Sequence, residues 1–109
     1  MKLRYFSHSS FQITTESGTK ILVDPFFDGN PTSPVNSADV KADYIILTHA
    51  HGDHLGDSFS IADRSNSLFI CVNELAEYCK SKGYKAHNMH IGGGFAFDFG
   101  RIPPNYQLY

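Results

Sequence analysis

The 109-residue sequence predicts an α/β fold in which two helices pack on a mixed β-sheet. Two observations support this. Three short runs typical of β-strands come first, with turn residues between them, as in an antiparallel meander. Segments typical of strands and helices then alternate along the rest of the chain. The combination of a meander with strand–helix–strand alternation indicates a layered fold whose sheet contains both antiparallel and parallel pairs.

The opening meander is predicted from apolar runs bounded by a Ser-rich turn and by Glu16-Ser17-Gly18. Its strands are expected at residues 2–6, 11–15 and 20–24. Residues 28–39 are almost all turn formers, and a loop of this length inside a small domain is usually functional or mobile. Because it lies just before a cluster of histidines, we expect it to form a flap over a site.

The second part of the chain is predicted to contain strands at 44–48, 68–72, 84–87 and 95–99. Apolar residues at helical spacing predict a helix over 57–64. Asn73 is expected to cap a second helix whose Leu75, Ala76 and Cys79 share one face. Gly83 is expected to end that helix, and Gly92-Gly93-Gly94 to form a turn before the last strand.

Composition excludes several classes of function. With 41% hydrophobic residues and 109 residues in total, the chain is expected to form one domain. A net charge of -2 with scattered Lys and Arg argues against nucleic-acid binding. No apolar run has the length of a signal-peptide core or a membrane span, so a cytoplasmic protein is expected. Cys71 and Cys79 are expected to be buried, reduced thiols.

The segment His49-Ala50-His51-Gly52-Asp53-His54 is the strongest functional signal. Imidazole nitrogen and carboxylate oxygen are ligands of zinc and similar divalent ions. His49 and His51 stand two residues apart at the end of a predicted strand, so both rings are expected on one side. Gly52 then lets the chain turn, so that Asp53 and His54 approach from another direction. One ion held by the first pair and a second held by the latter pair would fit this spacing. The simpler alternative is a polar turn that caps a helix.

Six separated blocks of the chain form a recognisable pattern. The blocks are Tyr5-Phe6-Ser7-His8-Ser9-Ser10-Phe11, Ile21-Leu22-Val23-Asp24-Pro25-Phe26, Gly29-Asn30-Pro31, the stretch from Leu47 to Asp57 that contains the His-x-His-x-Asp-His motif, Ile91-Gly92-Gly93 and Phe97-Asp98-Phe99-Gly100. Together they resemble the metallo-β-lactamase superfamily, and in particular its small metal-dependent hydrolases of unassigned substrate, which are similar to the sugar-phosphate lactonase group. They occur in the same order over residues 1 to about 102, which makes the resemblance specific.

The resemblance implies an αββα sandwich built from two similar halves, of which this chain would be the N-terminal half. It also implies one or two divalent ions, most readily Zn²⁺ with Mn²⁺ as an alternative, at the edge between the halves. His49, His51, Asp53 and His54 match ligands, whereas a third histidine, a bridging aspartate and a last histidine have no counterpart here. The chain is therefore expected to be a truncated, partial domain over 1–109, with 103–109 as a divergent tail that begins near Arg101-Ile102-Pro103-Pro104.

Three further residues are candidates for supporting roles. Asp24 is either a turn residue before Pro25 or a carboxylate that orients the ligand loop or the distal nitrogen of a histidine. His8 either lines the site as a proton donor or belongs to an ordinary polar turn. Asn30 either contacts substrate from the flap or forms a turn before Pro31. His87 and His90 are disfavoured as replacement ligands.

The motif and the resemblance together predict a metal-dependent hydrolase that uses a metal-activated water. The resemblance implies a small ester, lactone or phosphoester as the substrate. Asp53 and His54 are the predicted catalytic residues, with Asp53 also orienting the nucleophile. Two alternatives remain open. The chain is an inactive member with a partial metal site, or it forms a homo-oligomer that shares an interfacial metal and covers the exposed face of the half-sandwich.

Overall fold

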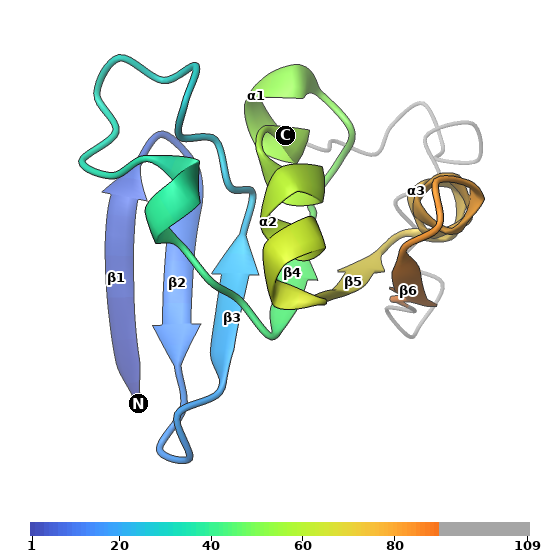
Figure 1. Cartoon of the computed structure of the whole chain (residues 1–109), viewed down its shortest axis with the longest axis horizontal. Helices are drawn as coiled ribbons and strands as arrows, with labels where there is room; N and C mark the ends of the chain where they lie inside the picture. Colours follow the sequence, from blue (N-terminus) through green and yellow to red (C-terminus); the bar gives the residue numbers. More distant parts are fainter. Residues whose placement is uncertain (90–109) are drawn as a thin grey trace, which may run out of the picture.

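The computed structural model describes residues 1–89. Within that range six strands form one sheet in the order β1-β2-β3-β4-β5-β6 (Figure 1). The strands are β1 (Lys2–Ser7), β2 (Ser10–Thr14), β3 (Lys20–Val23), β4 (Tyr44–Ile46), β5 (Leu68–Cys71) and β6 (Lys85–Asn88). Spatial order follows sequence order, so each connection joins neighbouring strands.

The sheet is mixed, as the sequence predicts. β1, β2 and β3 pair antiparallel, which confirms the meander. β3, β4, β5 and β6 pair in parallel, with Leu22 opposite Ile45 and Ile45 opposite Phe69. Since parallel strands need a crossover connection, each of these pairs is joined by a longer segment.

The crossovers supply the helices, α1 (Gly52–Leu55), α2 (Ser58–Ser65) and α3 (Asn73–Ser81), and one 3-10 turn, η1 (Ser37–Asp39). Crossovers between parallel strands are nearly always right-handed, so consecutive crossovers in this strand order place their helices on one face. Figure 1 shows α2 lying over β4 and α3 beside β6. The α/β class with two main helices is therefore confirmed.

The core lies between this sheet face and the helices. Leu22, Ile45 and Phe69 are fully buried at facing positions of three neighbouring strands. The helices contribute Ile61 and Ala62 from α2 and Leu75, Ala76 and Cys79 from α3 to the same cluster. The predicted apolar face of the second helix is thus confirmed.

The opposite face of the sheet carries apolar side chains that the described residues leave open. By register this face includes Leu3, Tyr5 and Tyr44, whose side chains are 68%, 58% and 36% exposed. A β-sheet with two apolar faces normally packs against a second layer. The expectation that another copy of the chain covers this face stays a prediction.

The predicted strand 44–48 is too long, because β4 ends at Ile46. Leu47 still donates its N–H to the Ile70 carbonyl, but the Thr48 N–H donates to the Asp24 carboxylate instead of continuing the ladder. His49 and His51 therefore lie in a loop, and the argument from strand periodicity does not apply to them. The short helix α1, which begins at Gly52, was not predicted.

The second main helix differs from its prediction by one residue. Asn73 is the first residue of α3, and Val72 is the capping residue. Gly83 follows the helix with φ of +91°, which agrees with its predicted role at the helix end. The predicted turn at 92–94, the strand at 95–99, His90 and the tail 103–109 lie outside the described residues.

Both cysteines are free and buried, as predicted. Burial, with Cys79 as a neighbour, raises the pKa of the Cys71 thiol to about 12. Burial also raises the pKa of Cys79. Both groups are therefore neutral thiols near pH 7, and a structural role fits them better than a reactive one. None of the helices in residues 1–89 is long and apolar enough to cross a membrane.

Gly56 lets the end of α1 approach the segment after β3 very closely. A Cβ atom at this position would lie 2.3 Å from the Pro25 carbonyl oxygen and 2.9 Å from the Phe26 Cα. The φ of Gly56 is also +48°, a conformation that strains other residues. The next residue, Asp57, donates its N–H to the same Pro25 carbonyl at 2.8 Å. This contact fixes α1 against the end of β3.

We predict that Gly56→Ala destabilises the fold more than Gly18→Ala. Both glycines have positive φ, so each substitution carries a backbone cost of roughly 1–2 kcal/mol. Nothing lies within 4 Å of the Cβ position at Gly18, whereas Gly56 adds an overlap with backbone that costs about 1–3 kcal/mol more. Urea unfolding of the two variants measures the difference. Equal losses would contradict the close contact with Pro25.

Candidate metal centre

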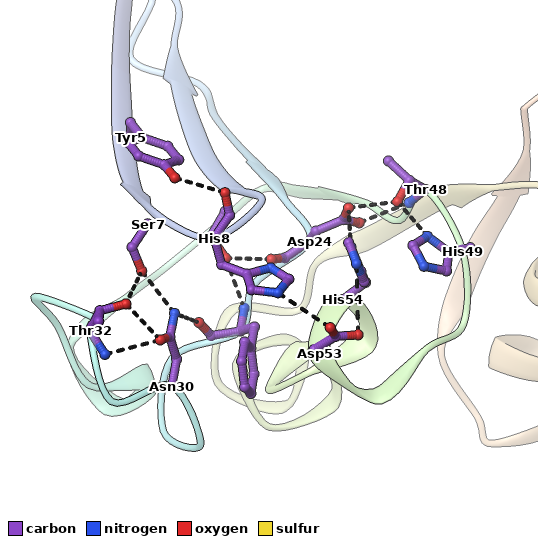
Figure 2. A network of polar contacts seen from close by, with 12 residues as sticks. Tyr5, Ser7, His8, Asp24, Asn30, Thr32, Thr48, His49, Asp53 and His54 are labelled. Atoms are coloured by element: carbon purple, nitrogen blue, oxygen red, sulfur yellow. Dashed lines mark hydrogen bonds and ion pairs between the residues drawn. The ribbon is translucent and has the colours of Figure 1, made fainter. Parts of the chain in front are cut away.

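The predicted site residues gather where β3 and β4 end. Asp24 directly follows β3, and Thr48 and His49 lie just beyond β4, which runs parallel to it. α1 then brings Asp53 and His54 to the same place (Figure 2). In open α/β sheets, sites form at the carboxyl ends of parallel strands, and this site follows that rule.

The Asp24 carboxylate organises this end of the sheet. Its side chain is buried, and its backbone has a φ of +44°, which is uncommon for a residue other than glycine. Oδ1 accepts the Thr48 N–H at 2.8 Å, and Oδ2 accepts the Thr48 hydroxyl at 2.6 Å and the His54 Nδ1–H at 2.9 Å. One carboxylate thus joins the ends of β3 and β4 to α1. Of the two roles predicted for Asp24, the hydrogen bond to His54 Nδ1 favours the one in which its carboxylate orients a histidine.

These bonds determine which nitrogen of each ring is free. His54 donates from Nδ1 to Asp24, so its Nε2 carries the lone pair. The Thr48 hydroxyl has a single hydrogen, which it gives to Asp24, and its oxygen lies 2.9 Å from His49 Nδ1. His49 must then donate from Nδ1 as well, which leaves its Nε2 free. Asp24 therefore orients His54 directly and His49 through Thr48.

His49 also has a shifted proton affinity. Burial lowers the pKa of His49 below its ordinary value, and the neighbouring His54 and His51 lower it further. The ring is therefore neutral at pH 7. A histidine must be neutral to bind a metal, so this shift favours ligation.

Two groups of possible ligands come together within the described residues. Asp24, His49 and His54 form one, and His8, Asp53 and His54 form the other, with the ligand atoms of each group within 4.8 Å of one another. The ring centroids of His49 and His54 are 3.9 Å apart. The donors are imidazole nitrogen and carboxylate oxygen, the set that zinc and related divalent ions accept. The residues therefore fit a divalent cation.

His51 belongs to neither ligand group, although its ring contacts that of His49 with centroids 4.6 Å apart. The residue is exposed and lies at the start of α1. The sequence predicts that His49 and His51 hold one ion, and in the structure the ring of His49 lies nearer to that of His54 than to that of His51. The pairing of Asp53 with His54 does appear, within the second ligand group.

His8 and Asn30 have different surroundings. The His8 Nε2 lies 3.3 Å from Asp53 Oδ2, so this residue of the β1–β2 turn faces one of the predicted ligands (Figure 2). The Asn30 side chain instead donates to the Ser7 hydroxyl at 2.8 Å and to the Phe26 carbonyl, and it accepts from Thr32. These bonds use the polar atoms of the Asn30 side chain for contacts within the protein. A role in the turn is therefore favoured over contact with substrate.

The loop at 28–39 is tied to its surroundings. Asp28 accepts hydrogen bonds from the Ser37 N–H and hydroxyl, and these bonds lower the pKa of Asp28. Arg64 of α2 donates to the Ser37 carbonyl. These bonds hold the loop against α2, which argues against a freely moving flap.

Two residues that the sequence reasoning did not select support the site. Thr48 links Asp24 to His49, and Ser10 donates to the Asp24 carbonyl at 2.6 Å while accepting the Phe26 N–H. The position of Thr48, immediately before the histidine motif, was the available signal. Ser10 lies far from the motif in sequence, and nothing local marks it.

Comparison with known proteins places this site in a family. Residues 2–94 match the family described as Beta-lactamase superfamily domain. A UPF0173 metal-dependent hydrolase of Geobacillus thermodenitrificans is 50% identical over 102 residues, which are 94% of this chain and 45% of that protein. One from Heliobacterium modesticaldum is 47% identical over 102 residues, 94% of this chain and 42% of its own length. The chain thus spans less than half the length of these curated relatives.

Solved structures agree with this family. Igni18, described as a metallo hydrolase from the archaeon Ignicoccus hospitalis, aligns with a TM-score of 0.74 and 33% identity over 89% of this chain and 42% of its own. An isothiocyanate hydrolase from Delia radicum gut bacteria shares the fold with a TM-score of 0.61 and 22% identity, over 83% of this chain and 41% of its own. The match over 2–94 and the agreement of fold lead to one conclusion: the chain belongs to the metallo-β-lactamase superfamily, where its relatives are the UPF0173 metal-dependent hydrolases.

Proposed function

We propose that this chain carries the metal-binding residues of a hydrolase that acts on a small ester, lactone or phosphoester. The observation that supports this most directly is the Asp24–Thr48 arrangement, which leaves the Nε2 atoms of His49 and His54 free. His54 Nε2 lies 3.7 Å from the Asp53 carboxylate. The relatives carry the name metal-dependent hydrolase. The net charge of -2 argues against a phosphodiester polymer as substrate.

The proposed cofactor is a divalent ion, with Zn²⁺ preferred and Mn²⁺ as the alternative. Asp53 and His54 would hold it, and His49, whose ring centroid lies 3.9 Å from that of His54, would supply a further imidazole. When bound, such an ion lowers the pKa of water and polarises a carbonyl or phosphoryl oxygen.

The chain itself contributes positioning and charge. Asp24 and Thr48 hold two rings in one tautomer, which removes the cost of ordering them when ligands assemble. Asp53 has an exposed fraction of 48% and directs its oxygens to His8 and His54. Its carboxylate is therefore open to solvent and is the group best placed to orient an attacking nucleophile.

A second candidate is metal binding without turnover. The chain spans 42–46% of the first curated relatives, and the superfamily resemblance implies further ligands that have no counterpart in these 109 residues. A site with fewer protein ligands binds its ion more weakly and leaves more positions to solvent. Metal affinity and hydrolysis must therefore be measured separately.

We predict that the purified chain binds Zn²⁺. His49→Ala is expected to weaken this binding at least about tenfold, because the proposed metal site loses the imidazole of His49. Competition with a chromophoric chelator gives the affinity, and p-nitrophenyl acetate and p-nitrophenyl phosphate test hydrolysis. His87→Ala is the control, because His87 is exposed on β6 and belongs to neither ligand group.

Each outcome has a distinct meaning. Zinc binding together with hydrolysis that falls in His49→Ala supports the hydrolase. Zinc binding with no hydrolysis of either ester selects the second candidate. An absence of zinc binding at saturating supply would rule out both.

We further predict that Asp24→Asn weakens zinc binding about 10- to 100-fold and lowers the free energy of unfolding by roughly 1–3 kcal/mol. The amide has one acceptor oxygen for the three donors that now bond to the carboxylate, so at least one donor loses its partner. Asp43→Asn is the matched control, because Asp43 is exposed and accepts the Lys20 N–H at the other end of β3. If both variants bind zinc like the parent chain, Asp24 does not orient the ligands.

A further inference from the structure

We propose that His8 is a ligand of the same divalent ion that Asp53 and His54 bind. This inference rests on the proposed metal site and adds a donor from outside the histidine motif. His8 lies in the turn between β1 and β2, and its ring points toward Asp53 and His54 (Figure 2). A ligand from this turn would connect the meander to the parallel part of the sheet through the metal.

The spacing of the donor atoms fits a shared ion. His8 Nε2 lies 3.3 Å from Asp53 Oδ2, and His54 Nε2 lies 3.7 Å from Asp53 Oδ1. Ligands 2.0–2.1 Å from a tetrahedral zinc are about 3.3–3.4 Å from one another. A charge-assisted hydrogen bond between imidazole and carboxylate is shorter, at about 2.7–2.9 Å. The observed separations thus match neighbouring ligands better than a direct hydrogen bond.

The free ring nitrogen of His54 faces the place where this ion would bind. His54 Nδ1 donates to Asp24, so the nitrogen that faces Asp53 is the one with the lone pair. The rings of His8 and His54 lie edge to face, with centroids 5.2 Å apart. The three ligand atoms lie within 4.8 Å of one another, and the His8 and Asp53 side chains are 35% and 48% exposed. An ion can therefore enter from solvent without rearrangement of the core.

The turn holds His8 in an unfavourable backbone conformation. Ser7 and His8 have φ of 129° and 55°, values that cost energy in residues other than glycine. The Tyr5 hydroxyl donates to the His8 carbonyl at 2.8 Å, and the Ser7 hydroxyl accepts from Asn30 and Thr32. These contacts keep the turn in place, so the His8 ring is held near Asp53 before any ion binds.

The other roles for His8 predict different behaviour. As an imidazolium paired with Asp53, it would compete with a cation for that carboxylate, and its loss would leave zinc affinity equal or improved. As a group that contacts only substrate, it would change hydrolysis and leave zinc affinity unaltered. Loss of a ligand lowers zinc affinity and also changes the Co²⁺ spectrum, whereas loss of a residue that only positions Asp53 lowers affinity without removing a donor from the ion.

The test compares His8→Asn with the parent chain. Asn tolerates the left-handed backbone of residue 8, so the turn is retained while the imidazole is lost. Zn²⁺ alone is titrated in competition with a chromophoric chelator, and Co²⁺ is used to record the visible absorption that reports ligand number. Thermal unfolding in EDTA checks that the metal-free fold is unchanged. His87→Asn is the control, since it removes an exposed imidazole outside the ligand groups.

We expect His8→Asn to weaken zinc binding at least about tenfold and to change the Co²⁺ spectrum, while His87→Asn does neither. If the parent chain binds zinc and His8→Asn binds it equally well, His8 is not a ligand and the proposed hydrolase site stands without it. If the parent chain binds no zinc, the proposed function fails together with this inference.

Discussion

The structure of this site depends on one buried carboxylate. Asp24 accepts hydrogen bonds from Thr48 and His54, and so it joins the ends of two parallel strands to the helix that carries Asp53 and His54, the proposed ligands. Burial of a charged group is costly unless its oxygens are hydrogen-bonded, and here each oxygen has a partner. The same bonds that satisfy Asp24 determine the free nitrogens of His49 and His54. The same hydrogen bonds therefore stabilise the strand ends and orient the histidine rings.

The parallel strands explain why these residues meet. β3 and β4 are neighbours that run in the same direction, so the residues after Val23 and after Ile46 emerge at the same edge of the sheet. Gly56 then allows α1 to lie against Pro25, which brings Asp53 and His54 back over that edge. Backbone topology thus brings together side chains that are about 25–30 residues apart in sequence, as expected for α/β sheets.

Much of the fold could be predicted from the sequence, because the strands and helices follow local periodicity. The meander, the alternation after it and the buried face of α3 all appear as expected. The errors lie where side chains compete with the backbone: β4 ends early because the Thr48 N–H bonds to Asp24 rather than to a strand. The His-x-His-x-Asp-His motif is local, so the sequence alone shows it. The approach of His8 to Asp53 depends on the register of β1 and β2 and on a strained turn, which no local pattern encodes.

Asp24 and Thr48 set the tautomers of both His49 and His54 in the metal-free protein. Nitrogen-15 NMR of the imidazole rings near pH 7 measures this directly, because protonated and unprotonated ring nitrogens have distinct shifts and couplings. We expect His49 and His54 both to carry hydrogen on Nδ1, with an unprotonated Nε2. Rings that carry hydrogen on Nε2, or that average between the two forms, would contradict it.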